Sequence, residues 1–193
     1  MELSVRHCAV LMLDIAGSVR LHDRIGDAAA ERQIRNLLDK IISASREHGG
    51  ECVKSSGDDV MLVFEHDAVN SAVSTAIASH LLAERLGMEL YAGLHAGPVE
   101  FRLTIGHPDA VGMTVSIAAR LHKLTEGAPG RIFMTEEWIS ALSPDLKNRA
   151  QLFGPRDLKG LGNVNIWTID WQDASVSTAT YMAPSQIITR SFT

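Results

Sequence analysis

The chain has 193 residues, of which 46% are hydrophobic and 21% charged, and its formal net charge is −5. This composition predicts one soluble globular domain, and the acidic balance argues against general binding of nucleic acid or of an anionic membrane surface. No stretch approaches the run of about 18 apolar residues that a membrane-spanning helix needs, and the start of the chain does not resemble a signal peptide. Cys8 and Cys52 have no zinc-ligand spacing, which favours a reduced pair of thiols and a cytoplasmic location.

The first half of the chain alternates apolar runs with one long amphipathic segment. "HCAVLML" (7–13) is a continuous apolar run ended by Asp14 and the turn "AGS", which predicts a buried strand. Residues 27–48 carry leucines and isoleucines at helical spacing and stop at Gly49-Gly50. Residues 51–55 and 59–65 flank a short polar turn and predict a hairpin. A second helix is expected over 67–86.

The second half predicts another strand, a third helix and smaller elements. The strand covers 89–102, with a turn or bend expected at Gly97-Pro98. The helix covers 110–124 and is broken by Gly127 to Gly130. The remaining predictions are a strand at 131–135, a short helix at 136–142 and a last strand at 163–171.

This order predicts an α+β fold, a ferredoxin-like sandwich whose antiparallel-rich sheet has its helices packed on one face. The domain is expected to cover residues 1–171. Residues 172–193 are dominated by Ser, Thr and Ala and contain no Lys or Glu. They predict a tail or a linker toward a regulatory domain or partner, and a docking strand is the alternative.

Two acids stand at the ends of predicted neighbouring strands. Asp14 ends the first strand, and Asp58 lies in the hairpin turn. Aspartate favours turns for local reasons, which would by itself explain Asp58. Together with the loop "IAGS", however, the two carboxylates predict a site for a hard divalent cation such as Mg²⁺. Asp59 is expected to be a solvated neighbour.

Five segments resemble, in order, the motifs of the class III nucleotidyl cyclases, over roughly residues 7–170. They are "LDIAGS" (13–18), "GGECVKSSGDDVMLVF" (49–64), "AGLHAGPV" (92–99), "DAVGMTVSIAARL" (109–121) and "DLKG" (157–160). The resemblance implies that Asp14, Asp58 and the backbone carbonyl of Ile15 bind two divalent cations, Mg²⁺ or Mn²⁺. These cations would assist attack of the ribose 3′-hydroxyl on the α-phosphate.

The same resemblance implies that Lys54 and Asp109 read the purine base. Adenine N1 accepts a hydrogen bond and N6 donates one, so a lysine and an aspartate suit ATP. Guanine reverses both edges, and the wrong base would leave polar groups unpaired at roughly 1–3 kcal/mol each. The pair therefore favours ATP over GTP.

The third helix carries a stripe of Gly112, Ser116 and Arg120 at intervals of four residues. The resemblance implies that Arg120 contacts the reacting phosphate and that Lys159 holds the terminal phosphates. Ser116 departs from the family, which usually has an asparagine that orients the ribose. Serine is shorter and reaches the sugar only through water, unless another residue substitutes for the asparagine.

In this family each active site lies between two subunits, and this chain carries both sets of residues. It is therefore expected to form a head-to-tail homodimer with two shared sites, in which it acts as an adenylyl cyclase in signal transduction. Two alternatives stay open: a catalytically weak, cyclase-like regulatory or nucleotide-binding domain, which Ser116 favours, and a guanylyl cyclase. A diguanylate cyclase is disfavoured because the chain lacks a "GGDEF"-like turn.

Overall fold

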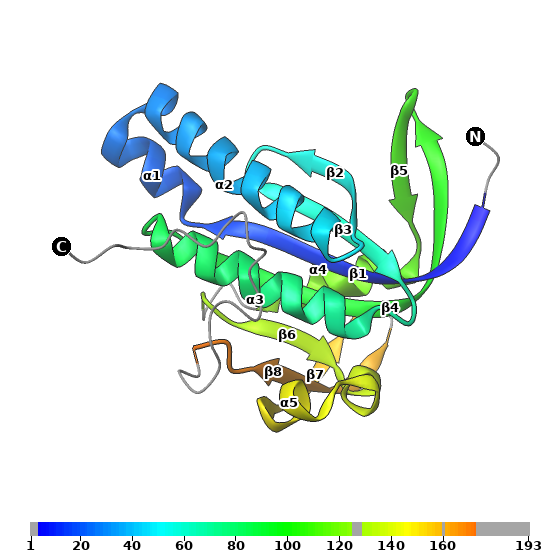
Figure 1. The fold of residues 1–193 in the computed structure, drawn as a ribbon. Helices are drawn as coiled ribbons and strands as arrows, with labels where there is room; N and C mark the ends of the chain where they lie inside the picture. The colour runs from blue at the N-terminus through cyan, green and yellow to red at the C-terminus, as the bar shows by residue number, and fades with distance from the viewer. Residues whose placement is uncertain (1–3, 125–128, 160, 173–193) are drawn as a thin grey trace.

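The computed structural model describes residues 4–124, 129–159 and 161–172, and its centre is a mixed sheet of eight strands (Figure 1). The strands are β1 (Ser4–Ala16), β2 (Glu51–Ser56), β3 (Asp59–Glu65), β4 (Glu89–Thr104), β5 (His107–Val111), β6 (Ile132–Thr135), β7 (Ala150–Leu158) and β8 (Gly162–Ile169). The helices are α1 (Ser18–Ile25), α2 (Asp27–Glu47), α3 (Val69–Arg85), α4 (Met113–Leu124) and α5 (Pro144–Asn148), with a 3₁₀ helix η2 (Glu136–Ala141).

The strand order is β2-β3-β1-β4-β6-β8-β7, with β5 paired to β4 beside this path. The first four strands, β2-β3-β1-β4, have the antiparallel ferredoxin-like arrangement that the sequence predicts. β6 then joins β4 in parallel, and β8 and β7 continue the sheet antiparallel to it. The α+β fold class is therefore confirmed.

Helices cover both faces of the sheet, so the prediction that they share one face was wrong. Leu11 and Leu13 of β1 belong to the core that also contains the apolar faces of α2 and α3. Val10, the neighbour between them, belongs to a second core with Ala118 of α4. Alternate residues of a strand point to opposite faces, so α4 lies across the sheet from α2 and α3 (Figure 1).

The long strand β4 is unbroken through Gly97-Pro98, where the sequence predicts a turn or bend, and it curves away toward β5 (Figure 1). Pro98 is paired with His7 of β1 on one side. On the other side β4 pairs with β6 only over residues 92–94 and with β5 only over residues 100–104. Pro98 therefore lies where β4 is locally an edge strand, and an edge tolerates a residue that lacks an N–H.

Several elements differ from the prediction. The segments that form α1, β5, α5 and β7 were not predicted, and α4 begins at Met113, three residues later than expected, because residues 107–111 form β5. β7 contains Gly154 and Pro155 and has a register shift between Leu152 and Gly154, which hides any alternating pattern. The predicted tail after Gln172, and Gly127 of the predicted helix stop, lie outside the described residues.

Candidate active site

The three predicted metal positions are brought together at one end of β1. Asp14 is paired with Asp59 of β3 and with Tyr91 of β4, so its backbone is held from both sides. The Ile15 N–H donates a hydrogen bond to the Asp58 carbonyl at 3.2 Å, which fixes the β2–β3 turn against the end of β1. The arrangement follows from the sequence, because the apolar residues of β1 and β3 form ladders that end where the acids begin.

The two acids differ in their surroundings. Asp14 Oδ2 lies 3.7 Å from His122 Nε2 on α4, while Asp14 Oδ1 is buried and has no hydrogen-bond partner within the described part of the chain. The Ser18 hydroxyl, in the first turn of α1, donates a hydrogen bond to Asp58 Oδ2. An orphaned, buried carboxylate oxygen beside a second carboxylate has the chemistry that Mg²⁺ or Mn²⁺ requires.

The protein side chains alone do not enclose a cation. Over residues 4–124, 129–159 and 161–172, no group of three or more His, Cys, Asp or Glu side chains is arranged to hold a metal ion. Asp14 and Asp58 could therefore supply only part of a coordination shell, together with the Ile15 carbonyl. The remaining ligands of a magnesium ion usually come from substrate phosphates and water.

Asp59 is not the solvated neighbour that the sequence predicts. It is half-buried and stands directly across the ladder from Asp14, so both side chains project from the same face of the sheet. Burial raises the pKa of the Asp59 carboxyl, and the charges of Asp14 and Asp58 raise it further, against a smaller opposing effect of Lys54. The α4 face at this end therefore concentrates negative charge.

The predicted base-reading residues lie on two strands that contact each other, β2 and β5. Lys54 is exposed and follows an irregularity in the β2–β3 pairing between Cys52 and Lys54. Asp109 is half-buried on β5, where it accepts hydrogen bonds from the Thr104 hydroxyl at 2.9 Å and from the Ala110 N–H at 3.0 Å. These bonds leave further lone pairs on the carboxylate.

The two predicted phosphate-binding residues are linked directly. The Arg120 guanidinium on α4 donates a hydrogen bond to the backbone carbonyl of Lys159, in the turn after β7. Ser116 lies one turn before Arg120 and is half-buried, so both belong to one side of α4. Gly112, expected on the same stripe, precedes the helix, and its carbonyl accepts the Ser116 N–H at 3.1 Å.

Asp109 lies apart from the acids, whereas Lys54 is close enough to Asp59 to oppose the rise in the pKa of its carboxyl. Asp14 pairs with Tyr91 near the start of β4, whereas Asp109 pairs with Arg102 near its end. The structure therefore brings the acids together, places the strands of Lys54 and Asp109 side by side, and joins Arg120 to Lys159.

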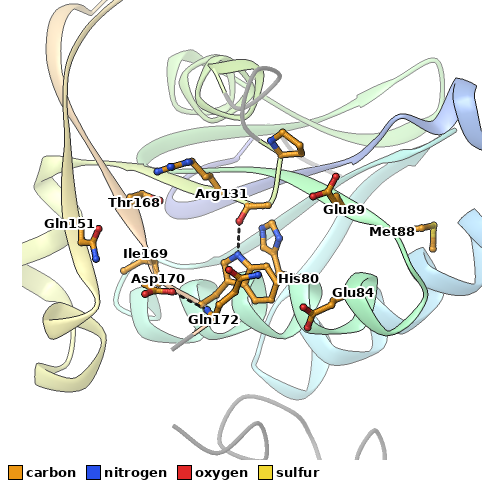
Figure 2. A pocket seen from close by; sticks show the side chains of 13 residues that line it. His80, Glu84, Met88, Glu89, Arg131, Gln151, Thr168, Ile169, Asp170 and Gln172 are labelled. Atoms are coloured by element: carbon orange, nitrogen blue, oxygen red, sulfur yellow. Dashed lines mark hydrogen bonds between the residues drawn. The ribbon is translucent and has the colours of Figure 1, made fainter. Parts of the chain in front are cut away.

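The surface of the chain contains two cavities that bear on the location of the site. One, of about 410 Å³, lies between α3 and β8; its lining includes His80, Arg131 and Asp170, and none of the predicted site residues (Figure 2). The other, of about 310 Å³, borders Ile15 and Gly17 and is flanked by Arg20 and Arg24 of α1. The second cavity thus adjoins the loop that carries the acids.

Sequence reasoning missed His122 and misjudged Asp59. The role of Asp59 becomes visible only when the strand register is known, and that of His122 only when the packing of α4 is known. Asp59 follows from pairing the ends of two strands, and His122 lies four residues after Ala118, a residue that α4 buries against the sheet.

No family model matches the chain. Among curated proteins, the uncharacterized protein Rv1319c of Mycobacterium tuberculosis is 27% identical over 155 residues, which are 72% of this chain and 28% of that protein. Adenylate cyclase 2 of Rhizobium meliloti is 25% identical over 168 residues, 79% of this chain and 46% of that protein. The chain therefore spans less than half the length of these curated relatives.

Solved structures show a closer likeness in fold. The adenylyl cyclase CyaB from P. aeruginosa superposes with a TM-score of 0.74 at 22% identity, covering 88% of this chain and 96% of that one. The guanylate cyclase domain of RhGC from Catenaria anguillulae, solved in complex with GTP, gives 0.74 at 18% identity, covering 86% and 98%. The chain has the fold of the class III nucleotidyl cyclase catalytic domains. Because both adenylyl and guanylyl cyclases share this fold, the structural similarity does not distinguish an ATP substrate from a GTP substrate.

Proposed function

We propose that this chain is an adenylyl cyclase that converts ATP to 3′,5′-cyclic AMP and pyrophosphate in sites shared by two copies of the chain. The observation that carries the proposal is the convergence of Asp14, Ile15 and Asp58 at one end of β1, with a buried Asp14 oxygen that lacks a hydrogen-bond partner among the described residues. This arrangement occurs on the cyclase catalytic fold, at the positions that the motifs indicate.

Asp14, Asp58 and the Ile15 carbonyl are the residues that would hold two divalent cations, Mg²⁺ or Mn²⁺. When bound, these cations make the ribose 3′-hydroxyl more acidic and neutralise the leaving pyrophosphate. In the reaction the bond from O3′ to the α-phosphorus forms, the bond from that phosphorus to the pyrophosphate oxygen breaks, and the hydroxyl proton passes to water.

The residues of α4 and of the turn after β7 stabilise charge on the phosphates. Arg120 donates to oxygens on which negative charge develops during transfer, and Lys159 contributes a point charge to the terminal phosphates. Arg120 must exchange its bond to the Lys159 carbonyl for the substrate, so the two residues rearrange together on binding. Ser116 contacts the ribose through water.

Lys54 and Asp109 select adenine. The Lys54 ammonium donates to N1, and Asp109 accepts from the N6 amino group with the lone pairs that Thr104 and Ala110 leave unused. Guanine would place a donor against the lysine and an acceptor against the carboxylate. The proposal therefore includes a preference for ATP.

The site is completed by a second copy of the chain in a head-to-tail homodimer. The acids lie near the start of β4 and Asp109 near its end, which supports a division of labour between subunits. An isolated chain then offers only half-sites. We further propose that residues 1–171 are the catalytic domain and that residues 172–193 link it to a regulatory domain or partner.

Identification of the product tests the activity. Purified protein is incubated with Mn²⁺ and either ATP or GTP, and the products are identified by mass spectrometry. Cyclic AMP from ATP supports the proposal, whereas cyclic GMP alone would make the chain a guanylyl cyclase. Absence of both products from folded protein favours the catalytically weak, nucleotide-binding alternative, for which Ser116 is the structural reason.

Complementation tests the sharing of sites. Asp14→Ala and Arg120→Ala chains are each expected to be inactive, and mixing them in equal amounts should restore about one quarter of wild-type activity. Half of the random dimers are mixed, and one of their two sites is intact. Mixtures that stay inactive although mixed dimers form would show that each site belongs to a single chain.

A further inference from the structure

His122 faces the acid end of β1 from helix α4. Its side chain is buried, with 8% of the residue exposed, and its Nε2 lies 3.7 Å from Asp14 Oδ2. The other oxygen of the same carboxylate, Oδ1, is buried and has no hydrogen-bond partner within the described part of the chain. The two oxygens of Asp14 are therefore distinct: one faces an imidazole, and the other is available to a ligand.

The position of His122 is fixed by backbone packing. Gly93 of β4 lies beneath α4, and a Cβ at this glycine would overlap the Ala118 carbonyl oxygen and the backbone nitrogen of His122. The backbones of β4 and α4 therefore contact each other directly at His122, which fixes the helix on the sheet there. The imidazole is thus presented to Asp14 by a rigid helix and not by a loop.

Two other carboxylates lie close to Asp14. Asp59 stands opposite Asp14 on the same face of the sheet, and Asp58 lies in the adjoining turn. Repulsion between neighbouring carboxylates would turn the Asp14 side chain away from them in the absence of an attractive partner. His122, on α4, supplies such a partner.

We propose that His122 is a positioning residue that holds Oδ2 of Asp14 and thereby keeps Oδ1 directed at the catalytic cation. This inference rests on the proposed function, because it assigns His122 to the metal site of that function. Groups that orient a metal ligand typically contribute a factor of 10–100 to metal affinity.

Metal affinity can be measured without turnover. Mn²⁺ binding is followed by electron paramagnetic resonance in the presence of 3′-deoxy-ATP, which lacks the attacking hydroxyl. His122→Leu should weaken Mn²⁺ binding about 10–100-fold, and His122→Gln, which retains a donor, should recover most of the loss. In activity assays, His122→Leu should raise the Mn²⁺ concentration required for half-maximal rate more than it lowers the rate at saturating Mn²⁺.

His80 provides a matched control. It is also a buried histidine on a helix, with 2% of the residue exposed, and it lies on α3, across the sheet from α4. His80→Leu should leave Mn²⁺ affinity within twofold of wild type. Thermal unfolding of every variant establishes that it is folded, and if His122→Leu does not fold, His122→Gln and His122→Asn carry the comparison.

The outcomes separate this inference from the proposed function. Asp14→Asn is expected to abolish Mn²⁺ binding at this site. If Asp14→Asn abolishes binding but folded His122 variants bind like wild type, the positioning role is overturned while the cyclase proposal stands. If Asp14→Asn itself binds Mn²⁺ like wild type, the metal assignment and the role of His122 fail together.

Discussion

The acid end of β1 and the ribbon that carries Asp109 are supported in different ways. Asp14 belongs to a strand paired on both sides, with α4 packed against the face on which its side chain lies. Asp109 belongs to β5, which pairs only with β4 among the described strands and extends from the body with it (Figure 1). At the turn of this ribbon Ile105 is 94% exposed and has a φ of 52°, an unfavourable backbone for a β-branched residue.

The difference matches the tasks that we propose for the two regions. Cation ligands must be held within a fraction of an ångström, which a doubly paired strand can achieve in a single chain. Base recognition tolerates more adjustment, and in the proposed dimer it takes place against surfaces from another subunit. The exposed ribbon is therefore suited to contribute to a site that is complete only on assembly.

The largest effect on activity is expected from removing one of the carboxylates at the end of β1. Asp58→Asn should reduce the rate of cyclic AMP formation by about 1000-fold, because it removes a charge that the divalent cations require. The protein should remain folded, since the Ser18 hydroxyl can still donate to the amide oxygen. Rate measurements at saturating Mn²⁺, with circular dichroism as the control for folding, check this expectation, and near-normal rates would remove Asp58 from the site.

An exchange of polarity at the base-reading pair should have the next largest effect. In Lys54→Glu with Asp109→Asn, the carboxylate accepts from guanine N1–H and the amide donates to O6. The ratio of kcat/KM for ATP to that for GTP should fall roughly 100-fold, because two polar contacts change sign. Each single variant should lose activity with ATP without gaining GTP, and an unchanged ratio in the double variant would remove these residues from base recognition.

A smaller gain is expected on α4. Ser116→Asn should raise kcat about 10-fold, because the longer amide reaches the ribose directly instead of through water. Ser116→Ala is the matched control and should leave kcat at or below the wild-type value. A folded Ser116→Asn enzyme that is no faster would contradict the assignment of this position to the ribose.

The smallest effect on activity is expected far from both regions, at His80. It lines the cavity drawn in Figure 2, its burial lowers its pKa to about 3, and its Nε2 has no hydrogen-bond partner among the described residues. Because the folded pKa lies below the unfolded value of about 6.5, stability is fully present above pH 6.5 and is lost as the pH falls toward 3.

On acidification from pH 7 to pH 4.5, wild type should therefore lose about 3 kcal/mol more unfolding free energy than His80→Leu. The activity of the variant at pH 7 should be unchanged. Chemical denaturation at the two pH values measures the difference in unfolding free energy. Equal losses of stability in both proteins on acidification would show that His80 does not titrate on unfolding.

The sequence was informative where a buried strand ends in a functional residue. The apolar run before Asp14 and the polar turn around Asp58 predict both strands, and their pairing puts the acids together without further information. Helix α2 was equally predictable because its apolar residues follow helical spacing, and α3 because its segment is rich in Ala, Val, Ile and Leu.

The sequence was least informative at the edges and on the second face of the sheet. β5 and β7 are short or irregular edge strands whose exposed residues carry no clear alternation, and α1 buries only Leu21. The apolar residues of α4 predict a helix but not the side of the sheet to which it binds. Only packing decides this, and it also decides that His122 meets Asp14.

Gly93 fixes the position of α4 against the sheet and so affects the contacts that the helix makes on both of its sides. The missing side chain sets how closely the helix approaches β4, and the same helix presents His122 to Asp14 and Arg120 to the Lys159 carbonyl. In the proposed dimer these two contacts belong to two different active sites. Any tilt of α4 during one turnover would thus be transmitted mechanically to the neighbouring site, so that the two catalytic events would not be independent.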